Sequence, residues 1–130
     1  MGRNFGFFWL LAGFLGLLAA STAGAGSAII AVAAERPEVN APVSAVAARS
    51  PYLLFFDERG VLLEALANPH RQAGKNAGPL LVDFLAAKGV RTFIAGEFGG
   101  KMVAAMQGHA IKHQVADGEA AVAVEAALVQ

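Results

Sequence analysis

The sequence predicts an α/β domain with a five-stranded mixed sheet and helices on its faces. Residues 52–56 and 61–66 are apolar runs on either side of the turn 57–60, as expected for a β-hairpin. From residue 79 onward, helix-like stretches alternate with short strand-like ones. Strands that are separated by single helices run parallel and are joined by right-handed crossovers. The predicted element order is therefore β-β-β-α-β-α-β-α.

The five predicted strands are short and mostly apolar. Residues 28–34 contain Val and Ile and form the first strand, and Pro51 and Asp57 bound the second. The segment 35–49 between these two strands contains prolines and shows little periodicity, so we expect a long loop there. The remaining predicted strands are residues 61–66, 91–95 and 111–115.

The first predicted helix begins at Pro79, because proline favours the first helical position, with Gly78 or Asn76 near the N-cap. Gly89 ends this helix, since glycine is common just past a helix C-terminus. Its apolar side chains fall on one helical face, which predicts packing on the sheet. They are Leu80, Leu81, Phe84 and Leu85.

Two further helices are predicted from their end signals. The glycine-rich turn 96–100 leads into the second helix, and Gly108 ends it. Asp117 is predicted to cap the last helix, with Glu119 in the first turn, where the helix dipole favours a negative charge.

The N-terminal residues 1–25 have the pattern of a secretory signal peptide. Arg3 precedes the apolar residues 5–20, and small residues follow them. Cleavage leaves residues 26–130 as one domain that acts outside the cytoplasm, in the periplasm or as a secreted protein. The alternative is an uncleaved membrane anchor with the domain outside the cytoplasm, since the next charged residue after Arg3 is Glu35.

The composition excludes several classes of function. Lys and Arg together number 10 and Asp and Glu number 10, so the chain lacks the positive charge of a nucleic-acid-binding protein. It contains no cysteine, which excludes disulfides and thiolate metal ligands. Stability must therefore come from an ordinary packed core.

The loop 68–78 concentrates side chains that apolar packing does not require. His70, Arg71, Lys75 and Asn76 can each donate to, or ligate, an electron-rich group. Imidazole binds iron, copper, nickel and zinc, so His70 is the candidate metal ligand, although an exposed loop histidine is the simpler alternative. The two lysines beside glycine turns, Lys75 and Lys101, are either anion ligands or solvated surface residues.

The predicted topology places this loop at a shared edge. The exits of the parallel strands are 68–78, 96–100 and 116–118, and the loop 35–49 reaches the same end. Open α/β sheets bind ligands outside the carboxyl ends of their strands, and free helix N-termini there favour anions. The predicted ligand-binding residues are His70, Arg71, Lys75, Asn76, Arg49, Gly99, Gly100 and Lys101.

The remaining polar residues do not assemble an enzyme. His109 follows the end of a predicted helix and is interpreted as structural, and His113 is predicted to face the core beside Ile111 and Val115. No histidine pair has the helical i,i+4 spacing of a zinc site. The strands lack the clustered carboxylates that a metal-dependent nuclease needs. We therefore predict a protein without catalytic activity.

Seven short motifs carry a family resemblance through their order and spacing. They are Ile30-Ala-Val-Ala33, Ser50-Pro-Tyr-Leu-Leu-Phe-Phe-Asp57, Asn68-Pro69, the loop 74–78, Leu85-Ala-Ala-Lys-Gly-Val90, Ile94-Ala-Gly-Glu-Phe-Gly99 and Gly108-His-Ala-Ile-Lys112. Together they resemble the dinitrogenase iron–molybdenum cofactor-binding domain family, over nearly all of residues 28–129.

The resemblance implies an RNase H-like three-layer fold and a carrier that binds an iron–sulfur or iron–molybdenum cluster without turnover. Family members commonly have a His-Phe-Gly-Arg run, and its histidine is the implied cluster ligand. Here Arg49 remains, but Val46, Ala47 and Ala48 occupy the preceding positions. Two functions therefore stay open. The chain is either a carrier of a metal cluster, metal ion or small anionic ligand, or an exported structural or interaction module with an envelope protein partner and no ligand.

Overall fold

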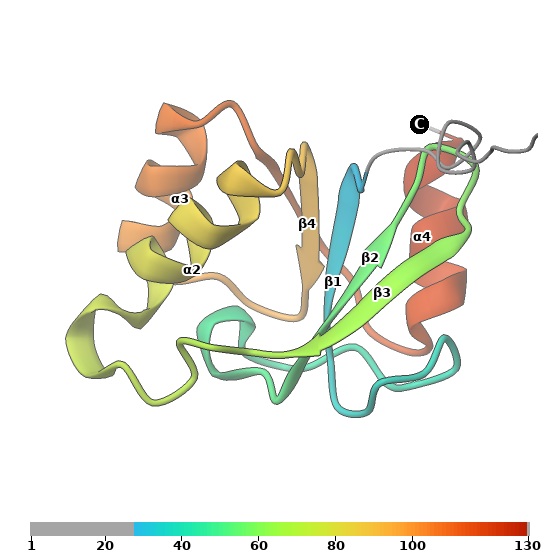
Figure 1. Ribbon diagram of the computed structural model, residues 1–130, viewed down its shortest axis with the longest axis horizontal. Coiled ribbons are helices and arrows are strands. Elements are labelled where there is room, and N and C mark those ends of the chain that lie inside the picture. The colour runs from blue at the N-terminus through green and yellow to red at the C-terminus, as the bar shows by residue number, and fades with distance from the viewer. Residues whose placement is uncertain (1–27, 130) are drawn as a thin grey trace, which may run out of the picture.

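The computed structural model describes residues 28–129, so the predicted signal peptide or anchor over residues 1–25 lies outside the described part. One sheet forms the centre of the molecule, with the strand order β3-β2-β1-β4-β5 (Figure 1). The strands are β1 (Ile30–Ala34), β2 (Tyr52–Phe56), β3 (Leu62–Ala67), β4 (Thr92–Ala95) and β5 (Lys112–Val115). The helices are η1 (Ala47–Arg49), η2 (Gly74–Asn76), α2 (Ala77–Ala87), α3 (Gly100–Gly108) and α4 (Ala120–Leu128).

The sheet is mixed, as predicted. β2 pairs antiparallel with both β1 and β3, while β1 with β4 and β4 with β5 pair in parallel. All strands except β2 therefore point the same way, and their carboxyl ends meet at one edge. This arrangement confirms the predicted fold class and the predicted order of elements.

The α/β domain has three layers, with α2 and α3 on one face of the sheet and α4 on the other (Figure 1). The alternation of side chains along the strands divides the core in two. Phe55, Phe93 and Leu81 belong to the core beneath α2 and α3. Phe56 and Ile94 belong to the core beneath α4. A strand with apolar residues at every position, such as β1, is buried on both faces.

The segment 35–49, predicted as an unstructured loop, is held against the sheet by backbone hydrogen bonds. The N–H of Ser44 donates to Ala33, and the N–H of Gly96 donates to the Ser44 carbonyl at 2.8 Å. A Cβ on Gly96 would stand 2.8 Å from the carbonyl oxygen of Ala45. The segment therefore approaches the exit of β4 so closely that only glycine fits there.

Two predicted helix starts are displaced in the structure. α2 begins at Ala77, so Pro79 is the third helical residue and not the first, while Asn76, one of the two residues predicted near the N-cap, is confirmed as the N-cap. The N-cap of α4 is Glu119, and the prediction that Asp117 caps this helix is wrong. Gly118 lies between them with φ +78°, which separates Asp117 from the helix by a left-handed turn.

The environment of β5 also differs from the prediction. His113 and Val115 are exposed, and Val115 keeps 67% of its surface in solvent. β5 is the last strand of the sheet, so the neighbouring layers cover it less than they cover the central strands. Of the segments described, none forms a helix long and apolar enough to cross a membrane.

Candidate functional site

A pocket of about 280 Å³ opens where η1 and the first turns of α2 and α3 meet. These elements follow the exits of the parallel strands or belong to the segment 35–49, so the pocket lies at the edge that the topology predicts. Its lining residues come from three separate parts of the chain. They are Ala48 and Arg49, then Gly74, Lys75, Ala77, Gly78 and Pro79, and then Gly99, Gly100, Lys101 and Met102.

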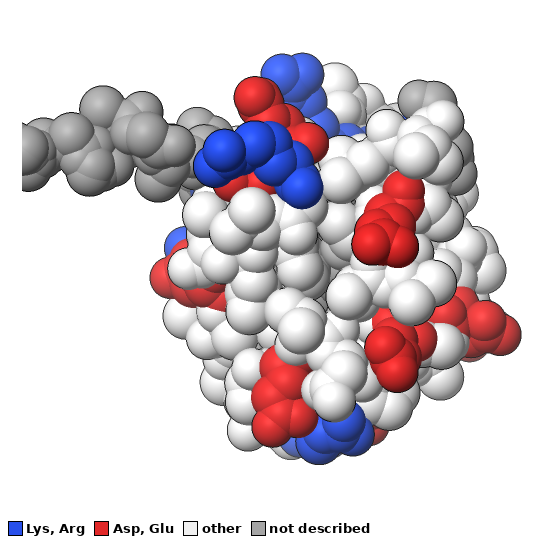
Figure 2. Space-filling view, turned by 90° about the vertical axis from the view of Figure 1, so that its right-hand side faces the viewer, with Lys and Arg blue, Asp and Glu red and all other residues white. Residues whose placement is uncertain are grey.

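The structure brings together five of the eight residues predicted to bind a ligand: Arg49, Lys75, Gly99, Gly100 and Lys101. Three cationic side chains therefore line one small pocket, and none of the described residues that line it is acidic. On the α4 side of the molecule, acidic side chains are scattered over a largely uncharged surface, and Lys and Arg side chains lie at its upper and lower margins (Figure 2).

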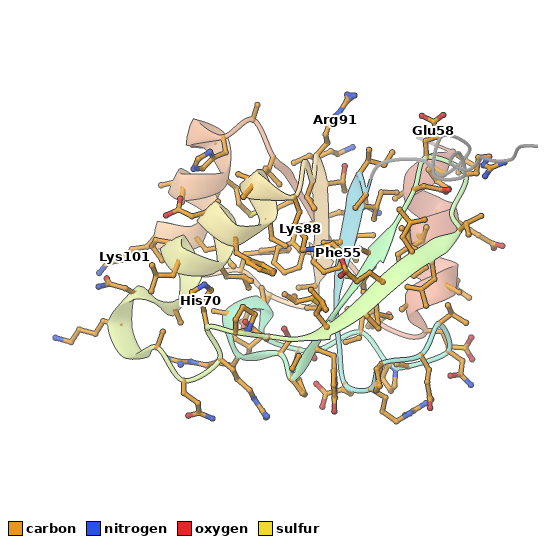
Figure 3. All side chains as sticks on the ribbon, in the orientation of Figure 1. Phe55, Glu58, His70, Lys88, Arg91 and Lys101 are labelled. Carbon is orange, nitrogen blue, oxygen red and sulfur yellow. The ribbon has the colours of Figure 1, made fainter. Side chains whose placement is uncertain are left out.

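The other three predicted residues, His70, Arg71 and Asn76, do not line the pocket. The imidazole of His70 packs edge-on against the ring of Phe84, with 6.2 Å between the ring centroids. In Figure 3, His70 and Lys101 lie on the α2 and α3 side of the molecule but on different segments. Metal binding by His70 stays a prediction.

Arg49 ties the first two parts of the lining together. Its Nη1 donates to the carbonyl of Arg71 at 2.7 Å, and its Nη2 donates to the carbonyl of Gly74 at 3.0 Å. In return, Nε of Arg71 donates to the Arg49 carbonyl at 3.2 Å. The rigid guanidinium fork is suited to two acceptors at once. Arg49 and Arg71 thus hold the loop between β3 and α2 against η1.

Asn68 adds a second, buried connection between the same segments. Its Nδ2 donates to the carbonyls of Ala48 and Ser50 at 3.2 and 3.0 Å, and its Oδ1 accepts from the N–H of His70 at 2.9 Å. The sequence alone indicates only that an asparagine can hydrogen-bond its own loop. The partners on the other segment become visible only in the folded chain.

The third part of the lining, residues 99–102, makes no comparable side-chain hydrogen bonds among the described residues. Gly99 is the N-cap of α3 and no side chain caps the helix, while the first helical N–H groups have no intrahelical acceptor. A Cβ on Gly99 or Gly100 would meet no atom of the described residues within 4 Å, and neither glycine has a positive φ. Packing therefore does not require glycine at either position.

These features define what the pocket can bind. Cationic side chains and uncapped backbone N–H groups attract an anion. Within residues 28–129, no group of three or more His, Asp and Glu side chains is placed to hold a metal ion. A cluster that needs cysteine thiolates does not fit, because the chain has none.

The histidines predicted to be structural do make internal contacts. Nε2 of His109, at the C-cap of α3, lies 3.1 Å from Oδ1 of Asp83 on α2. The ring of His113 packs against Phe98, with 5.3 Å between centroids, and Phe98 packs in turn on Phe93. Phe98 thereby fixes the loop that carries Gly99.

Comparison with known proteins confirms the resemblance seen in the sequence. Residues 27–130 match the family model described as dinitrogenase iron-molybdenum cofactor. The apo form of the orange protein (ORP) from Desulfovibrio gigas has a similar structure, with TM-score 0.72 and 24% identity, and the match covers 82% of this chain and 91% of that one. No curated protein matches the chain.

Two more solved structures share the fold. A Thermotoga protein, TM1290, described as a NifB protein of the DUF35 family, matches with TM-score 0.64 and 27% identity, over 76% of this chain and 85% of that one. PH0822 matches with TM-score 0.64 and 20% identity, over 77% and 89%. These similarities support the three-layer fold independently of the family match.

Proposed function

The chain belongs to the dinitrogenase iron-molybdenum cofactor family, and from this premise we propose that it is a non-catalytic carrier of a small anionic ligand. The proposed ligand is a metal cluster or metal-containing anion that retains its own sulfur or oxygen ligands. It binds in the pocket between η1 and the N-termini of α2 and α3. The name of the family and that of the related apo protein agree with binding of a removable group.

The main support for this proposal is that two glycines, Gly99 and Gly100, have free space around them and lie beside three cationic side chains. Gly99 and Gly100 have free space where a side chain would stand, at an uncapped helix N-terminus. Glycine at the start of a helix costs conformational entropy, and here no packing contact offsets that cost. A ligand that approaches the backbone N–H groups explains both glycines, while Arg49, Lys75 and Lys101 balance its charge.

The pocket supports a carrier better than an enzyme. Among the residues that the structure describes, its lining holds no His, Asp, Glu, Ser, Thr, Tyr or Cys side chain to serve as a nucleophile or general base. The pocket offers positive charge, backbone hydrogen-bond donors and a concave surface. Such a set binds an anion reversibly and leaves the ligand's own bonds unchanged.

Anion binding to the full chain, purified without oxygen, tests the proposal. The probes are molybdate and tetrathiomolybdate, an oxyanion and a thioanion of the same metal, with elemental analysis of the protein as isolated. We expect Lys101→Glu and Lys75→Glu to weaken binding at least about tenfold, since each replaces attraction by repulsion. Arg91→Glu is the matched control, because Arg91 lies at the other end of the sheet (Figure 3).

The same titration separates the alternatives. If His70→Ala abolishes binding, a metal–imidazole bond holds the ligand and the purely anionic site is wrong. If the wild-type chain contains no metal and binds neither probe, the chain is a structural or interaction module. Val46, at the position of the histidine that the resemblance implies as a cluster ligand, would then mark the loss of the site.

A further inference from the structure

The segment 69–76, between β3 and α2, is fixed at both ends but exposed along most of its length. It projects from the molecule at the lower left of Figure 1. Asn68, just before it, is buried and donates to two backbone carbonyls of a neighbouring segment, and Ala77, just after it, is also buried. Every residue from 71 to 76 is exposed. Only specific contacts can therefore hold the middle of this segment against the rest of the fold.

Arg49 makes those contacts. Its guanidinium donates to the carbonyls of Arg71 and Gly74, and its own carbonyl accepts from Nε of Arg71. Among the described residues, no other hydrogen bond joins residues 71–76 to η1, to a strand or to α3. Gly74 has a φ of +69°, and a Cβ there would meet no described atom within 4 Å. Close packing at Gly74 therefore does not supplement the bonds from Arg49.

The same arginine lines the pocket, together with Gly74 and Lys75 of the segment. A guanidinium has five N–H donors, and the two carbonyls use two of them. The others can donate to an anion while the segment stays attached. Gly74 and Lys75 line the pocket only while the segment lies against Arg49. An anion therefore meets an additional cation when the segment is attached, and binds that form more tightly.

We propose that residues 69–76 form a lid on one side of the pocket, and that Arg49 couples closure of this lid to anion binding. The inference rests on the proposed function, because it assigns a regulation to the same pocket. A ligand that binds the closed form more tightly shifts the lid toward closure, and closure raises the affinity for the ligand by the same factor. Loss of the Arg49 bonds opens the lid and favours release of the ligand.

Trypsin, which cleaves after arginine and lysine, reports on lid opening in the unmodified chain. The scissile carbonyl after Arg71 is the one that accepts from Nη1 of Arg49, and the Arg71 side chain donates to the Arg49 carbonyl. Trypsin must bind both groups of Arg71, so cleavage there requires the lid to open. Arg71 does not line the pocket, so a bound anion does not cover this site directly. Arg59, exposed in the turn between β2 and β3, is the matched control site.

The test is limited digestion of the full chain, purified without oxygen, with and without molybdate or tetrathiomolybdate. Mass spectrometry measures the rate of each cleavage. At a probe concentration about ten times its Kd, cleavage after Arg71 should slow about tenfold, because proteolysis follows the population of the open form. Cleavage after Arg59 should not change, which excludes inhibition of trypsin by the probe. In Lys101→Glu, which should bind the probe weakly, the same probe concentration should protect Arg71 much less.

Arg49→Lys separates the charge of Arg49 from its hydrogen bonds. Without probe, cleavage after Arg71 should rise about fivefold, and bound probe should protect this site less than in the wild type. Protection equal to that of the wild type overturns the role of Arg49. A wild type that binds a probe with no slowing after Arg71, or with equal slowing after Arg59, overturns the lid and leaves the carrier function intact. A wild type that binds neither probe overturns the carrier function, and the lid with it.

Discussion

One five-residue turn, 96–100, contains two kinds of glycine. Gly96 is enclosed, and a Cβ there would lie 2.8 Å from the carbonyl oxygen and 2.9 Å from the Cα of Ala45. Gly99 and Gly100, at the other end of the turn, have no described atom within 4 Å of a built Cβ. The fold requires the first glycine, and the proposed ligand accounts for the other two. Sequence alone does not separate these roles, because all three are glycines in one loop.

Gly96→Ala should give the largest change, because the new methyl group would collide with backbone and not with a movable side chain. We expect a loss of about 1–3 kcal/mol in the free energy of unfolding, the usual cost of overpacking. Denaturant titration measures it, with Gly99→Ala as the matched control in the same turn. Equal stability of the two variants would show that Gly96 is not required by packing.

Arg49→Ala should have a smaller effect on stability and a larger one on the pocket. It removes the hydrogen bonds to the carbonyls of Arg71 and Gly74, and we expect a loss of about 1 kcal/mol because the arginine is exposed. Hydrogen exchange should then rise in the loop 68–76 and stay unchanged in 96–100. Arg49→Lys keeps the positive charge but lacks the guanidinium that donates to both carbonyls. Hydrogen exchange in the loop 68–76 should therefore stay high in this variant.

Gly100→Ala should separate stability from binding. Alanine favours the helix, so we expect the free energy of unfolding to rise by about 0.5 kcal/mol. The added methyl group occupies the space next to the free N–H groups of α3, and binding of molybdate or tetrathiomolybdate should fall. A variant that is more stable and binds equally well would remove the functional explanation of the open glycines.

The smallest expected change comes from Asp57, in the β2–β3 turn, and it serves as a control for the pocket. Asp57 is buried, and its Oδ1 accepts from the N–H groups of Val61 and Arg59 at 3.0 and 2.8 Å. The hydrogen bond from Val61, above all, lowers the pKa of Asp57 despite the opposing effect of burial.

Because this pKa is lower in the folded chain than in the unfolded chain, Asp57 stabilises the fold above its ordinary pKa of about 3.9 and loses that contribution as the pH falls through the folded value. Thermal unfolding between about pH 5 and pH 2 should therefore show a smaller acid-dependent decrease in Asp57→Asn than in the wild type. Probe binding at neutral pH should be equal in the two proteins. A change in binding would mean that the two ends of the sheet are coupled.

Much of the fold follows from local patterns. The run 52–56 is apolar at every position and is a strand with those bounds in the structure. Errors occur where helices start. Asn76 and Glu119 are the N-caps of α2 and α4 without making side-chain caps, so the preferences that favour Pro79 and Asp117 do not decide those positions. The prediction that His113 faces the core is wrong, because alternation gives the face of a strand but not whether a layer covers that face.

Local patterns along the chain predict the order of strands and helices, the parallel exits at one edge, the membership in the family and the cationic character of the residues gathered there. These follow from periodicity, turn residues and motif order, which are local properties of the chain. Which residues share a pocket depends on the folded chain, where Arg49 lies beside Lys75 and Lys101 while His70 packs against Phe84. That assignment depends on contacts between segments far apart in the chain, such as Arg49 with Gly74 and Gly96 with Ala45, and local patterns do not encode which segments will touch.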